Sequence, residues 1–376
     1  MSTAGKPITC RAAVVWEQNQ PYKIEIVEVS VPKNGEVRVK LTSSGICHTD
    51  SHFQEGMFPS VAFPLVLGHE GAGIIESVGE GVTHLKSGDL VVLTFEAFCG
   101  ECDYCKNPNC NMCLKQPRNH LQMDGTSRMS YKGKFLSQFF SISTFSEYTV
   151  TSQWNVTKVN PKADRITLCL LGCCVPTGYG AAVNTAKVTP GSTCAIWGLG
   201  GVGMCIIMGC KNAGASKIIG IDINDKKFEL AKELGMTHFL NPKKVSNIPE
   251  AIAKLTTRGA DFCFVSVGVV PVMNEAFKSS QLHWGKTIII GSADQEAFVK
   301  AGVIDLLFGR QLCGSWCGSY KAVRDVPDLV EKSMKGDIQL EKLVTHRLPL
   351  DKINEAYEML KTGESLRAII DFDMKA

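Results

Sequence analysis

Four closely spaced cysteines carry the clearest chemical signal in this chain. Cys99, Cys102, Cys105 and Cys113 lie within one short segment. Four thiolates complete a tetrahedral zinc site and leave no position open for a substrate, so their spacing predicts a structural zinc. An iron–sulfur cluster is the alternative, because four cysteines can also hold one. Cys110 lies in the same segment but breaks the regular spacing.

A second set of residues with metal-binding chemistry is dispersed along the chain. Its members occur in residues 47–52, 68–70 and 172–174, and they include three histidines next to or near cysteines and acids. These residue types are common zinc ligands. Their positions in the sequence do not bring them together, however. A lone histidine is usually a surface or satisfied core residue, and a lone cysteine is usually buried as a small apolar side chain.

A glycine-rich segment predicts a dinucleotide site. It follows the predicted strand 193–197, opens a predicted helix that runs to about residue 213, and precedes Asp222 at the end of the next strand. In that context the pattern is the dinucleotide fingerprint, although a glycine-rich packing turn is the alternative. Asp222 would bind both ribose hydroxyls and repel a 2′-phosphate, which favours NAD over NADP. The predicted pyrophosphate-binding residues are Gly198, Leu199, Gly200, Gly201, Val202 and Gly203.

The elements that must position these residues differ between the two halves of the chain. The first half is rich in predicted strands, at residues 36–41, 71–78 and 89–95, and it favours hairpins and meanders. From about residue 190, strands and helices alternate, which predicts a parallel sheet covered on both faces. Its further strands are predicted at residues 217–222, 261–266 and 286–291, with helices at 225–234 and 271–279, and the tail has a helix at 351–361 and a strand at 366–372.

Composition limits the classes of protein that this chain can represent. Its 376 residues favour two domains, and a hydrophobic content of 44% allows a real core. A net charge of +3 offers no electrostatic footprint for nucleic acid or an anionic membrane. We find neither a signal peptide nor an apolar run that would span a bilayer, and therefore expect a cytoplasmic protein with reduced thiols.

Taken together, these motifs resemble the zinc-dependent medium-chain alcohol dehydrogenases, specifically the NAD-dependent branch of animals and plants. The resemblance covers essentially the whole chain. It implies an α/β fold in which a GroES-like β catalytic domain, residues 1–176 completed by 318–376, surrounds a doubly wound Rossmann domain, residues 177–317. The motifs that carry the resemblance are residues 45–50, 67–73, 143–150, 177–182 and 198–203, together with the four-cysteine segment.

The resemblance also implies roles for individual residues. Cys47, His69 and Cys173 would hold a catalytic zinc with an open fourth position, so that the chain would bind two zinc ions. Asp50 and Glu70 would support these ligands, with Asp50 orienting His69. The proton of the alcohol would pass from Thr49 through the cofactor ribose to His52. Further residues implied to bind NAD are His48, which stands where many relatives have arginine, Thr177, Lys227, Ile290, Gly291, Ser292 and Arg367.

The resulting prediction is a homodimeric NAD-dependent alcohol dehydrogenase that converts small alcohols and aldehydes. A glutathione-dependent formaldehyde dehydrogenase is the alternative within enzymes. A catalytically weak structural member is the alternative outside them. Phe58 and Ser60 stand where the formaldehyde branch has acids, His52 stands where that branch often has tyrosine, and Phe95 is implied to form an apolar wall near the zinc, so we favour apolar alcohols. Three departures from the family pattern concern pocket shape and activity level: Cys174, Val265 and Ser319.

Overall fold

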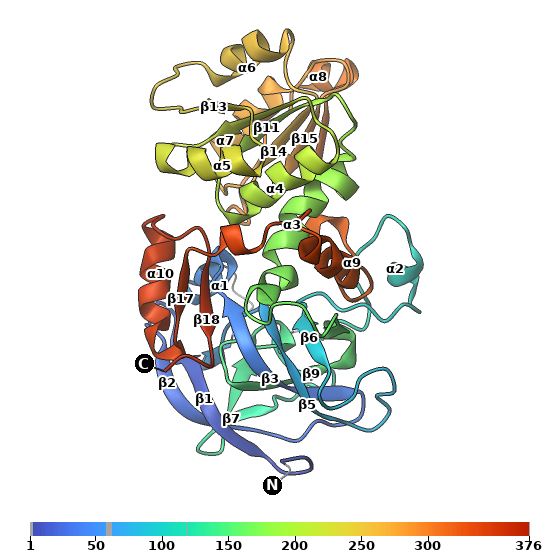
Figure 1. The fold of residues 1–376 in the computed structure, drawn as a ribbon, viewed down its shortest axis with the longest axis vertical. Helices are drawn as coiled ribbons and strands as arrows, with labels where there is room; N and C mark the ends of the chain where they lie inside the picture. Colours follow the sequence, from blue (N-terminus) through green and yellow to red (C-terminus); the bar gives the residue numbers. More distant parts are fainter. Residues whose placement is uncertain (1–2, 58–61, 118, 376) are drawn as a thin grey trace. The chain divides into compact units, whose positions relative to one another are not determined.

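The chain folds into two compact units. Figure 1 shows the computed structural model, which describes residues 3–57, 62–117 and 119–375. Residues 1–173, 321–336 and 340–376 form the first unit, which we call the β-rich unit. Residues 174–320 and 337–339 form the second, which we call the parallel-sheet unit. The first unit is therefore built from both ends of the chain, whereas the second is almost continuous in sequence.

The β-rich unit contains a closed barrel and a seven-stranded sheet. The C-terminal strand β18 (Ala368–Asp371) pairs antiparallel with β3 (Glu36–Gly45), so that Ile370 lies opposite Ser44 (Figure 1). The barrel strands are β1 (Ile8–Val15), β2 (Lys23–Val29), β7 (Met129–Tyr131), β8 (Lys134–Gln138) and β4 (Leu65–Val66). The other sheet strands are β10 (Val156–Lys158), β6 (Leu90–Leu93), β5 (Gly71–Val78), β9 (Tyr148–Ser152) and β17 (His346–Leu348).

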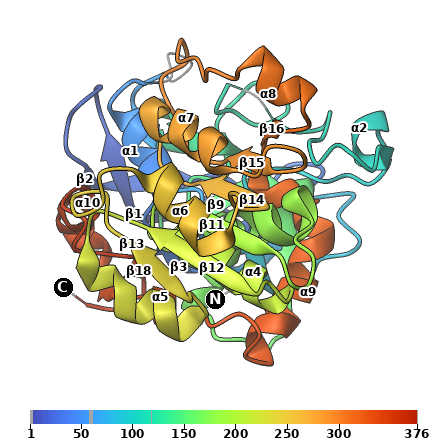
Figure 2. The same cartoon turned by 90° about the horizontal axis from the view of Figure 1, so that it is seen from above.

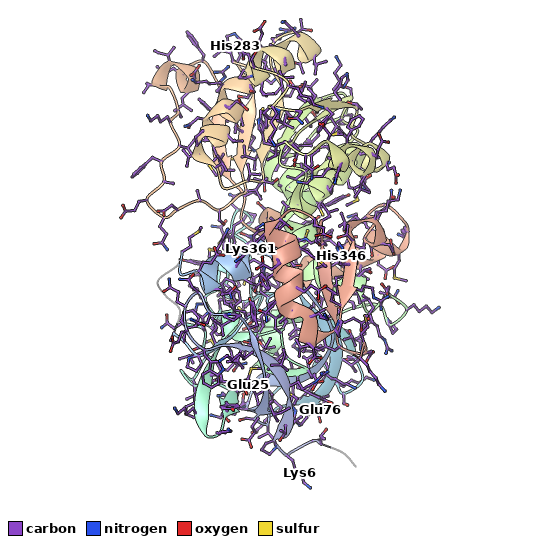
Figure 3. All side chains as sticks on the ribbon, turned by 90° about the vertical axis from the view of Figure 1, so that its left-hand side faces the viewer. Lys6, Glu25, Glu76, His283, His346 and Lys361 are labelled. Atoms are coloured by element: carbon purple, nitrogen blue, oxygen red, sulfur yellow. The ribbon has the colours of Figure 1, made fainter. Side chains whose placement is uncertain are left out.

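Strand β3 is more deeply buried than its alternating sequence predicts. The pattern at residues 36–41 is typical of a half-buried strand, but in β3 only Lys40 is exposed. Arg38 is fully buried because its guanidinium is satisfied: Nε lies 2.6 Å from the Glu76 carboxylate, and the other nitrogens donate to backbone carbonyls. Glu76 is labelled in Figure 3. Paired burial of this kind cannot be seen in one strand's polarity pattern.

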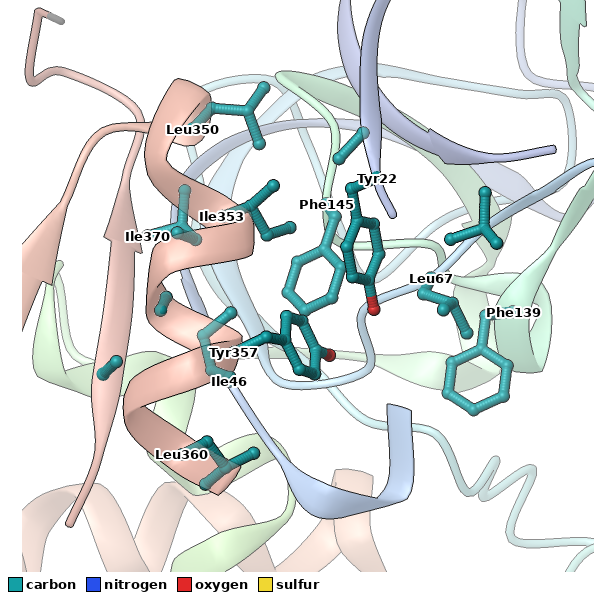
Figure 4. Packing of buried hydrophobic residues seen from close by; sticks show 14 of the residues in the cluster. Tyr22, Ile46, Leu67, Phe139, Phe145, Leu350, Ile353, Tyr357, Leu360 and Ile370 are labelled. Carbon is teal, nitrogen blue, oxygen red and sulfur yellow. The ribbon is translucent and has the colours of Figure 1, made fainter. Parts of the chain in front are cut away.

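A hydrophobic cluster joins the start of the chain to its C-terminal helix, α10 (Ile353–Lys361) (Figure 4). Tyr22, Phe145 and Tyr357 lie at its centre, and the rings of Tyr22 and Tyr357 stack with centroids 4.9 Å apart. Lys361, at the end of α10, forms a 2.9 Å ion pair with Glu55, which follows α1 (His48–Gln54). The C-terminal segment thus packs directly against elements formed by the first sixty residues.

The parallel-sheet unit confirms the predicted alternation of strands and helices. All six strands are parallel, and helices lie on both faces of the sheet (Figure 2). The strand order is β13 (His238–Leu240), β12 (Lys217–Ile221), β11 (Thr193–Trp197), β14 (Phe262–Val265), β15 (Lys286–Ile289) and β16 (Gln311–Gly314). The helices are α3 (Cys174–Gly180), α4 (Gly201–Asn212), α5 (Phe228–Leu234), α6 (Ile248–Thr256), α7 (Val270–Ser279) and α8 (Val303–Leu307).

Some elements differ from the sequence prediction. The helix predicted at 225–234 begins with the 3-10 turn Asp225–Lys227 before α5, and the one predicted at 351–361 begins with the 3-10 turn Leu350–Lys352 before α10. Helix α9 (Ala322–Met334), which contains Pro327, was not predicted from the sequence. Proline inside a periodic segment argues against a helix, which explains the omission.

His120 is buried in an aromatic cluster of the β-rich unit. Its ring stacks on Phe139 with centroids 5.4 Å apart, and the backbone N–H of Phe140 donates to its Nδ1 at 3.1 Å. A ring nitrogen that accepts a hydrogen bond belongs to the neutral form of the imidazole. Burial accordingly lowers the pKa of His120 to about 4.

This burial predicts a specific loss of stability in acid. In the unfolded chain, a histidine takes up a proton below about pH 6.5, whereas folded His120 resists protonation until about pH 4. Between pH 7 and pH 5 the native state should therefore lose about 2 kcal/mol through this residue. His120→Asn should remove that part of the pH dependence, whatever its effect at pH 7. Urea unfolding of both proteins at several pH values measures it, and parallel pH profiles would contradict the prediction.

Candidate active site and metal centres

The dispersed cysteines and histidine meet in the β-rich unit. Cys47 lies between β3 and α1, and His69 lies between β4 and β5. Cys173 directly follows the 3-10 turn Thr167–Gly172. The ligand atoms of these residues and of Glu70 all lie within 4.8 Å of one another. The resemblance implied the first three residues as ligands, and gave Glu70 only a supporting role. Its adjacency to His69 was the one signal in the sequence that could have placed it in this group.

Two glycines let these segments come close together. A Cβ atom on Gly45 would lie 2.2 Å from Oε2 of Glu70, and one on Gly172 would lie 2.6 Å from the carbonyl oxygen of Leu93. Both distances are too short for any larger residue at these positions. The glycines before Ile46 and Cys173 are therefore part of how the ligand group is assembled.

His69 has the environment of a metal ligand. Its Nδ1 lies 3.0 Å from Oδ1 of Asp50, an oxygen that also accepts from the backbone N–H of Gly68 at 2.9 Å. The carboxylate keeps a proton on Nδ1, which leaves the lone pair on Nε2. Nε2 is buried and has no hydrogen-bond partner in the part of the chain that the structure describes. A zinc ion at this atom would satisfy it.

The charges around His69 also favour a cation. A hydrogen bond with Cys173, together with the nearby charge of His69, lowers the pKa of the Cys47 thiol well below its usual value despite burial. Burial opposes charging of the His69 ring, but Asp50 and Cys47 outweigh it and raise the pKa of His69 well above its usual value. The thiolate is the form of cysteine that binds zinc. The group therefore attracts a positive charge, which zinc would supply in place of a proton.

Arg367 balances the remaining acid. Its guanidinium lies 3.3 Å from Oε1 of Glu70 and donates to the carbonyl oxygen of Ile46 at 2.9 Å. Both side chains are almost fully buried. Arg367 directly precedes β18, so the C-terminal strand brings this charge to the site. Its implied contact with the cofactor pyrophosphate stays a prediction.

The other implied catalytic residues follow Cys47 on α1. The Thr49 hydroxyl lies 3.7 Å from Sγ of Cys47, and the rings of His48 and His52 lie 6.4 Å apart. His52 Nδ1 is buried and has no hydrogen-bond partner among the described residues. The roles of Thr49, His48 and His52 stay predictions. Phe58 and Ser60, which bear on substrate choice, lie outside the described residues.

Aromatic side chains surround the His69 ring. The centroid of Phe95 lies 5.6 Å from that of His69, as expected for an apolar wall, and Phe139 and Phe140 lie at 5.7 and 6.0 Å. Phe139 and Phe140 were not predicted from the sequence to lie at this site. Phe140 has a positive φ of 47°, which is unusual for a phenylalanine and sets the direction of its side chain. No local pattern signals this conformation.

The four closely spaced cysteines also converge. Sγ atoms of Cys99, Cys102, Cys105 and Cys113 all lie within 4.8 Å of one another, and Cys110 is not part of this group. Backbone N–H groups of Leu114 and Cys105 lower the pKa of Cys102 to about 6, which favours its thiolate. Four thiolates would fill the coordination sphere of a tetrahedral zinc and leave no position for a substrate. The hydrophobic core around this group is small. A crosslinking metal would order this segment.

The glycine-rich segment lies in the parallel-sheet unit, between β11 and α4. Gly198 has a φ of +89°, and a Cβ atom on Gly203 would lie 1.9 Å from the Gly198 carbonyl oxygen, so both positions require glycine. An added Cβ on Gly200 would meet no atom within 4 Å. Packing within the protein therefore does not require a glycine at position 200. Close approach of the protein backbone to a bound pyrophosphate does require one. This arrangement fits a dinucleotide pyrophosphate.

Asp222 is held beside this turn. Its Oδ2 accepts from the backbone N–H of Leu199 at 2.7 Å and from Nζ of Lys227 at 2.9 Å. Its Oδ1 accepts from the backbone N–H of Asn224 at 2.9 Å. The structure therefore brings Asp222 and Lys227 together with the glycine-rich turn. Thr177 lies on α3, while Ile290, Gly291 and Ser292 follow β15 in the same unit.

The three departures from the family pattern have structural settings in this unit. Cys174 begins α3, and its Sγ lies 4.0 Å from Sγ of Cys205. Val265 is fully buried at the end of β14. The hydroxyl of Ser319 lies 2.7 Å from that of Thr185.

Comparison with known proteins follows the division into two parts. An alcohol dehydrogenase GroES-like domain matches residues 33–161, and a zinc-binding dehydrogenase domain matches residues 201–332. Over 377 aligned positions, the chain is 48% identical to alcohol dehydrogenase class-3 of Drosophila melanogaster, covering 99% of this chain and 100% of that protein. The chain belongs to the zinc-containing medium-chain alcohol dehydrogenases.

Solved structures of this family have the same fold. A zinc-binding alcohol dehydrogenase domain protein of Burkholderia ambifaria matches with a TM-score of 0.92 at 32% identity, covering 98% of this chain and 100% of that one. Benzyl alcohol dehydrogenase of Acinetobacter calcoaceticus matches with a TM-score of 0.91 at 32% identity, covering 97% and 99%. The predicted fold class, the dehydrogenase activity and the cofactors zinc and NAD are confirmed. No helix among the described residues has the length and apolarity to cross a membrane.

The two cysteine groups predict different consequences of losing one ligand. Cys173→Ser should lower the zinc content from two ions per chain to one and abolish alcohol oxidation, because this group lies beside Thr49 and His52. Cys99→Ser should also remove one zinc, but its main effect should be a lower unfolding temperature. Elemental analysis and thermal unfolding measure both effects. Cys110→Ser is the matched control and should change neither zinc content nor activity.

Proposed function

We propose that the chain reversibly oxidises primary and secondary alcohols to aldehydes and ketones, with a catalytic zinc held by Cys47, His69 and Cys173. This proposal rests on two observations: the ligand atoms of the three residues lie close together, and Nε2 of His69 is buried without a hydrogen-bond partner among the described residues. Bound zinc supplies Lewis-acid activation that lowers the pKa of the alcohol, and NAD accepts the hydride. Glu70 stays close to the ligand group, where Arg367 compensates its charge.

Thr49 and His52 would carry the proton that the alcohol loses. The Thr49 hydroxyl lies next to Cys47, so it can both accept and donate a hydrogen bond at the metal site. His52 is on the same helix, and its buried Nδ1 is free to take up a proton from a neighbouring donor. Histidine suits this role because its ordinary pKa lies near neutral pH.

NAD rather than NADP is the cofactor that Asp222 favours. A 2′-phosphate would bring a second negative charge next to this carboxylate, whereas ribose hydroxyls can donate to it. Lys227 is already paired with Asp222 at 2.9 Å, and the residues that follow Asp222 are Ile223 and Asn224. There is thus no arginine beside Asp222 in sequence to bind a phosphate.

An apolar alcohol fits the surroundings of His69 better than a charged one. Phe95, Phe139 and Phe140 surround this ring, and they offer apolar faces with no hydrogen-bonding group. Each additional buried CH₂ of a substrate contributes about 0.8 kcal/mol. We therefore propose primary and secondary alcohols with alkyl or aromatic groups as the substrates.

S-(hydroxymethyl)glutathione is a second candidate substrate, and one observation favours it. The Drosophila melanogaster relative at 48% identity is a class-3 alcohol dehydrogenase, which is the formaldehyde dehydrogenase type. Glutathione is charged, so this substrate would need charged or polar groups at the entrance of the pocket. Phe58 and Ser60, at the positions where the formaldehyde branch has acids, favour the apolar substrate instead.

A panel of substrates distinguishes the two proposals. With NAD in excess, KM should fall about fourfold for each CH₂ added between ethanol and hexanol, because each group is buried against the aromatic wall. Phe140→Ala should flatten this series, while Phe135→Ala, at an exposed phenylalanine on β8, should leave it unchanged. NADH formation is the readout. Faster oxidation of S-(hydroxymethyl)glutathione than of every alcohol would contradict the apolar assignment.

We further propose a cytoplasmic homodimer. None of the sixteen cysteines, all of which lie among the described residues, forms a disulfide bond, which suits a reducing compartment. In the parallel-sheet unit, β16 is an edge strand whose outer side has no neighbouring strand among the described residues. Phe298, Val303 and Leu307 nearby in sequence are 80%, 70% and 73% exposed. Exposed apolar residues beside an unpaired edge favour association with a second copy.

The homodimer can be tested in solution. Leu307→Lys should convert the dimer to a monomer, because a lysine cannot be buried in an apolar interface without a partner. Sedimentation velocity measures the mass of each species. Phe135→Lys, which introduces the same charge at an exposed phenylalanine of the β-rich unit, should stay dimeric. A wild-type protein that sediments as a monomer would overturn this proposal without affecting the enzymatic one.

A further inference from the structure

Asp50, which orients His69, has one carboxylate oxygen without a hydrogen-bond donor among the described residues. Oδ1 of Asp50 binds both His69 and the backbone of Gly68, but Oδ2 has no hydrogen-bond partner among the described residues. Asp50 is fully buried. A buried carboxylate oxygen without a donor costs about 1–3 kcal/mol or more, so a donor is expected close to it.

Two tyrosines have buried hydroxyl groups that could donate a hydrogen bond to this oxygen. The hydroxyl oxygens of Tyr22 and Tyr357 are buried, and neither has a hydrogen-bond partner in the described part of the chain. The side chains are only 4% and 3% exposed. Their rings are stacked at an interplanar angle of 21°, and Figure 4 shows that both hydroxyls point away from their backbones into the same region of the core. Each hydroxyl is a potential donor.

The helix that carries Asp50 packs against both tyrosines: Phe53, three residues after Asp50 on α1, belongs to their cluster, and the Gln54 side chain donates to the Gln20 carbonyl oxygen at 2.7 Å. The electrostatic environment agrees with this placement. Burial raises the pKa of both phenols well above the usual value, and the charge of Asp50 is the largest electrostatic cause of the further increase in each. The charge of Cys47 also acts on Tyr357. Two phenol oxygens and one carboxylate oxygen, each without a hydrogen-bond partner among the described residues, thus lie within one buried region beside the candidate metal ligands.

The positions of the two tyrosines are firmly fixed. Asn354 on α10 accepts from the backbone N–H of Tyr22 at 3.0 Å and donates to its carbonyl oxygen at 2.9 Å. Tyr357 lies three residues later on the same helix, so α10 holds both the backbone and the ring of Tyr22. Phe145 packs edge-on against both rings, with centroids 5.9 and 6.3 Å away. The hydroxyls are therefore held in place independently of Asp50.

We propose that Tyr22 and Tyr357 are positioning residues for the catalytic metal site: their hydroxyls and Oδ2 of Asp50 form one buried hydrogen-bond network, closed by a shared water molecule. A water with three polar partners satisfies the usual requirements for a buried site. The network would fix the carboxylate in the orientation in which Oδ1 binds His69 Nδ1, and so direct Nε2 toward the zinc. This inference rests on the proposed role of His69 as a zinc ligand.

The rate of zinc release tests this network without relying on turnover. Tyr22→Phe and Tyr357→Phe keep the rings but remove the hydroxyls, so packing should persist. In excess chelator, one of the two zinc ions should leave about 10-fold faster than in the wild type, which is typical of losing an outer-shell partner. The other zinc, at the four-cysteine group, should leave at the wild-type rate. The double variant should be less than multiplicative, because both hydroxyls act through one network.

Two controls make the result specific. Tyr131→Phe removes a hydroxyl elsewhere in the β-rich unit and should change neither rate. In a Cys173→Ser background, which is expected to hold only the four-cysteine zinc, Tyr357→Phe should have no effect on zinc release. Wild-type release rates in both tyrosine variants, multiplicative effects, or equal acceleration of both zinc ions would overturn the network. A wild-type chain that binds only one zinc would instead overturn the proposed catalytic site.

Discussion

The hydrogen bond between Asp50 and His69 is the contact around which the β-rich unit is organised. It joins a fully buried carboxylate to an imidazole whose other nitrogen is buried without a hydrogen-bond partner among the described residues. Such a buried charge is tolerated only where partners are placed accurately. The glycines at positions 45 and 172 allow the backbone segments to approach, and Arg367 compensates the second buried acid, Glu70. Burying these charged groups together thus requires both compensating charges and close packing of the backbone.

The two units differ in how far apart in the sequence their functional residues lie. The parallel-sheet unit takes its cofactor-binding features from one local segment, a strand, a turn and a helix, followed by Asp222 on the next strand. The β-rich unit assembles its candidate metal ligands from three separated segments. An aromatic layer of Phe95, Phe139 and Phe140 encloses His69, which lowers the local dielectric and strengthens the electrostatic interactions inside it.

How much could be predicted from sequence depended on the range of the contacts. The four-cysteine group and the glycine-rich turn are local, so spacing and context were sufficient for both. Cys47, His69 and Cys173 could be connected only through the family resemblance, because no spacing rule joins residues so far apart. Tyr22, Tyr357 and Phe140 were missed: each looks like an ordinary core residue in sequence, and its relation to His69 or Asp50 depends on long-range packing and on one unusual backbone angle.

The interrupted course of the β-rich unit has a consequence for how the enzyme is made. Domains generally fold as units while the chain is still emerging from the ribosome, in order of synthesis. The parallel-sheet unit is almost complete once residue 320 has emerged, but β18, α10 and Arg367 come from residues 340–376. The three candidate zinc ligands, Cys47, His69 and Cys173, therefore emerge before the parallel-sheet unit, whereas Arg367, which pairs with Glu70 beside them, emerges after it. The buried ion pair between Arg367 and Glu70, and with it the complete β-rich unit, is therefore formed only after translation has ended.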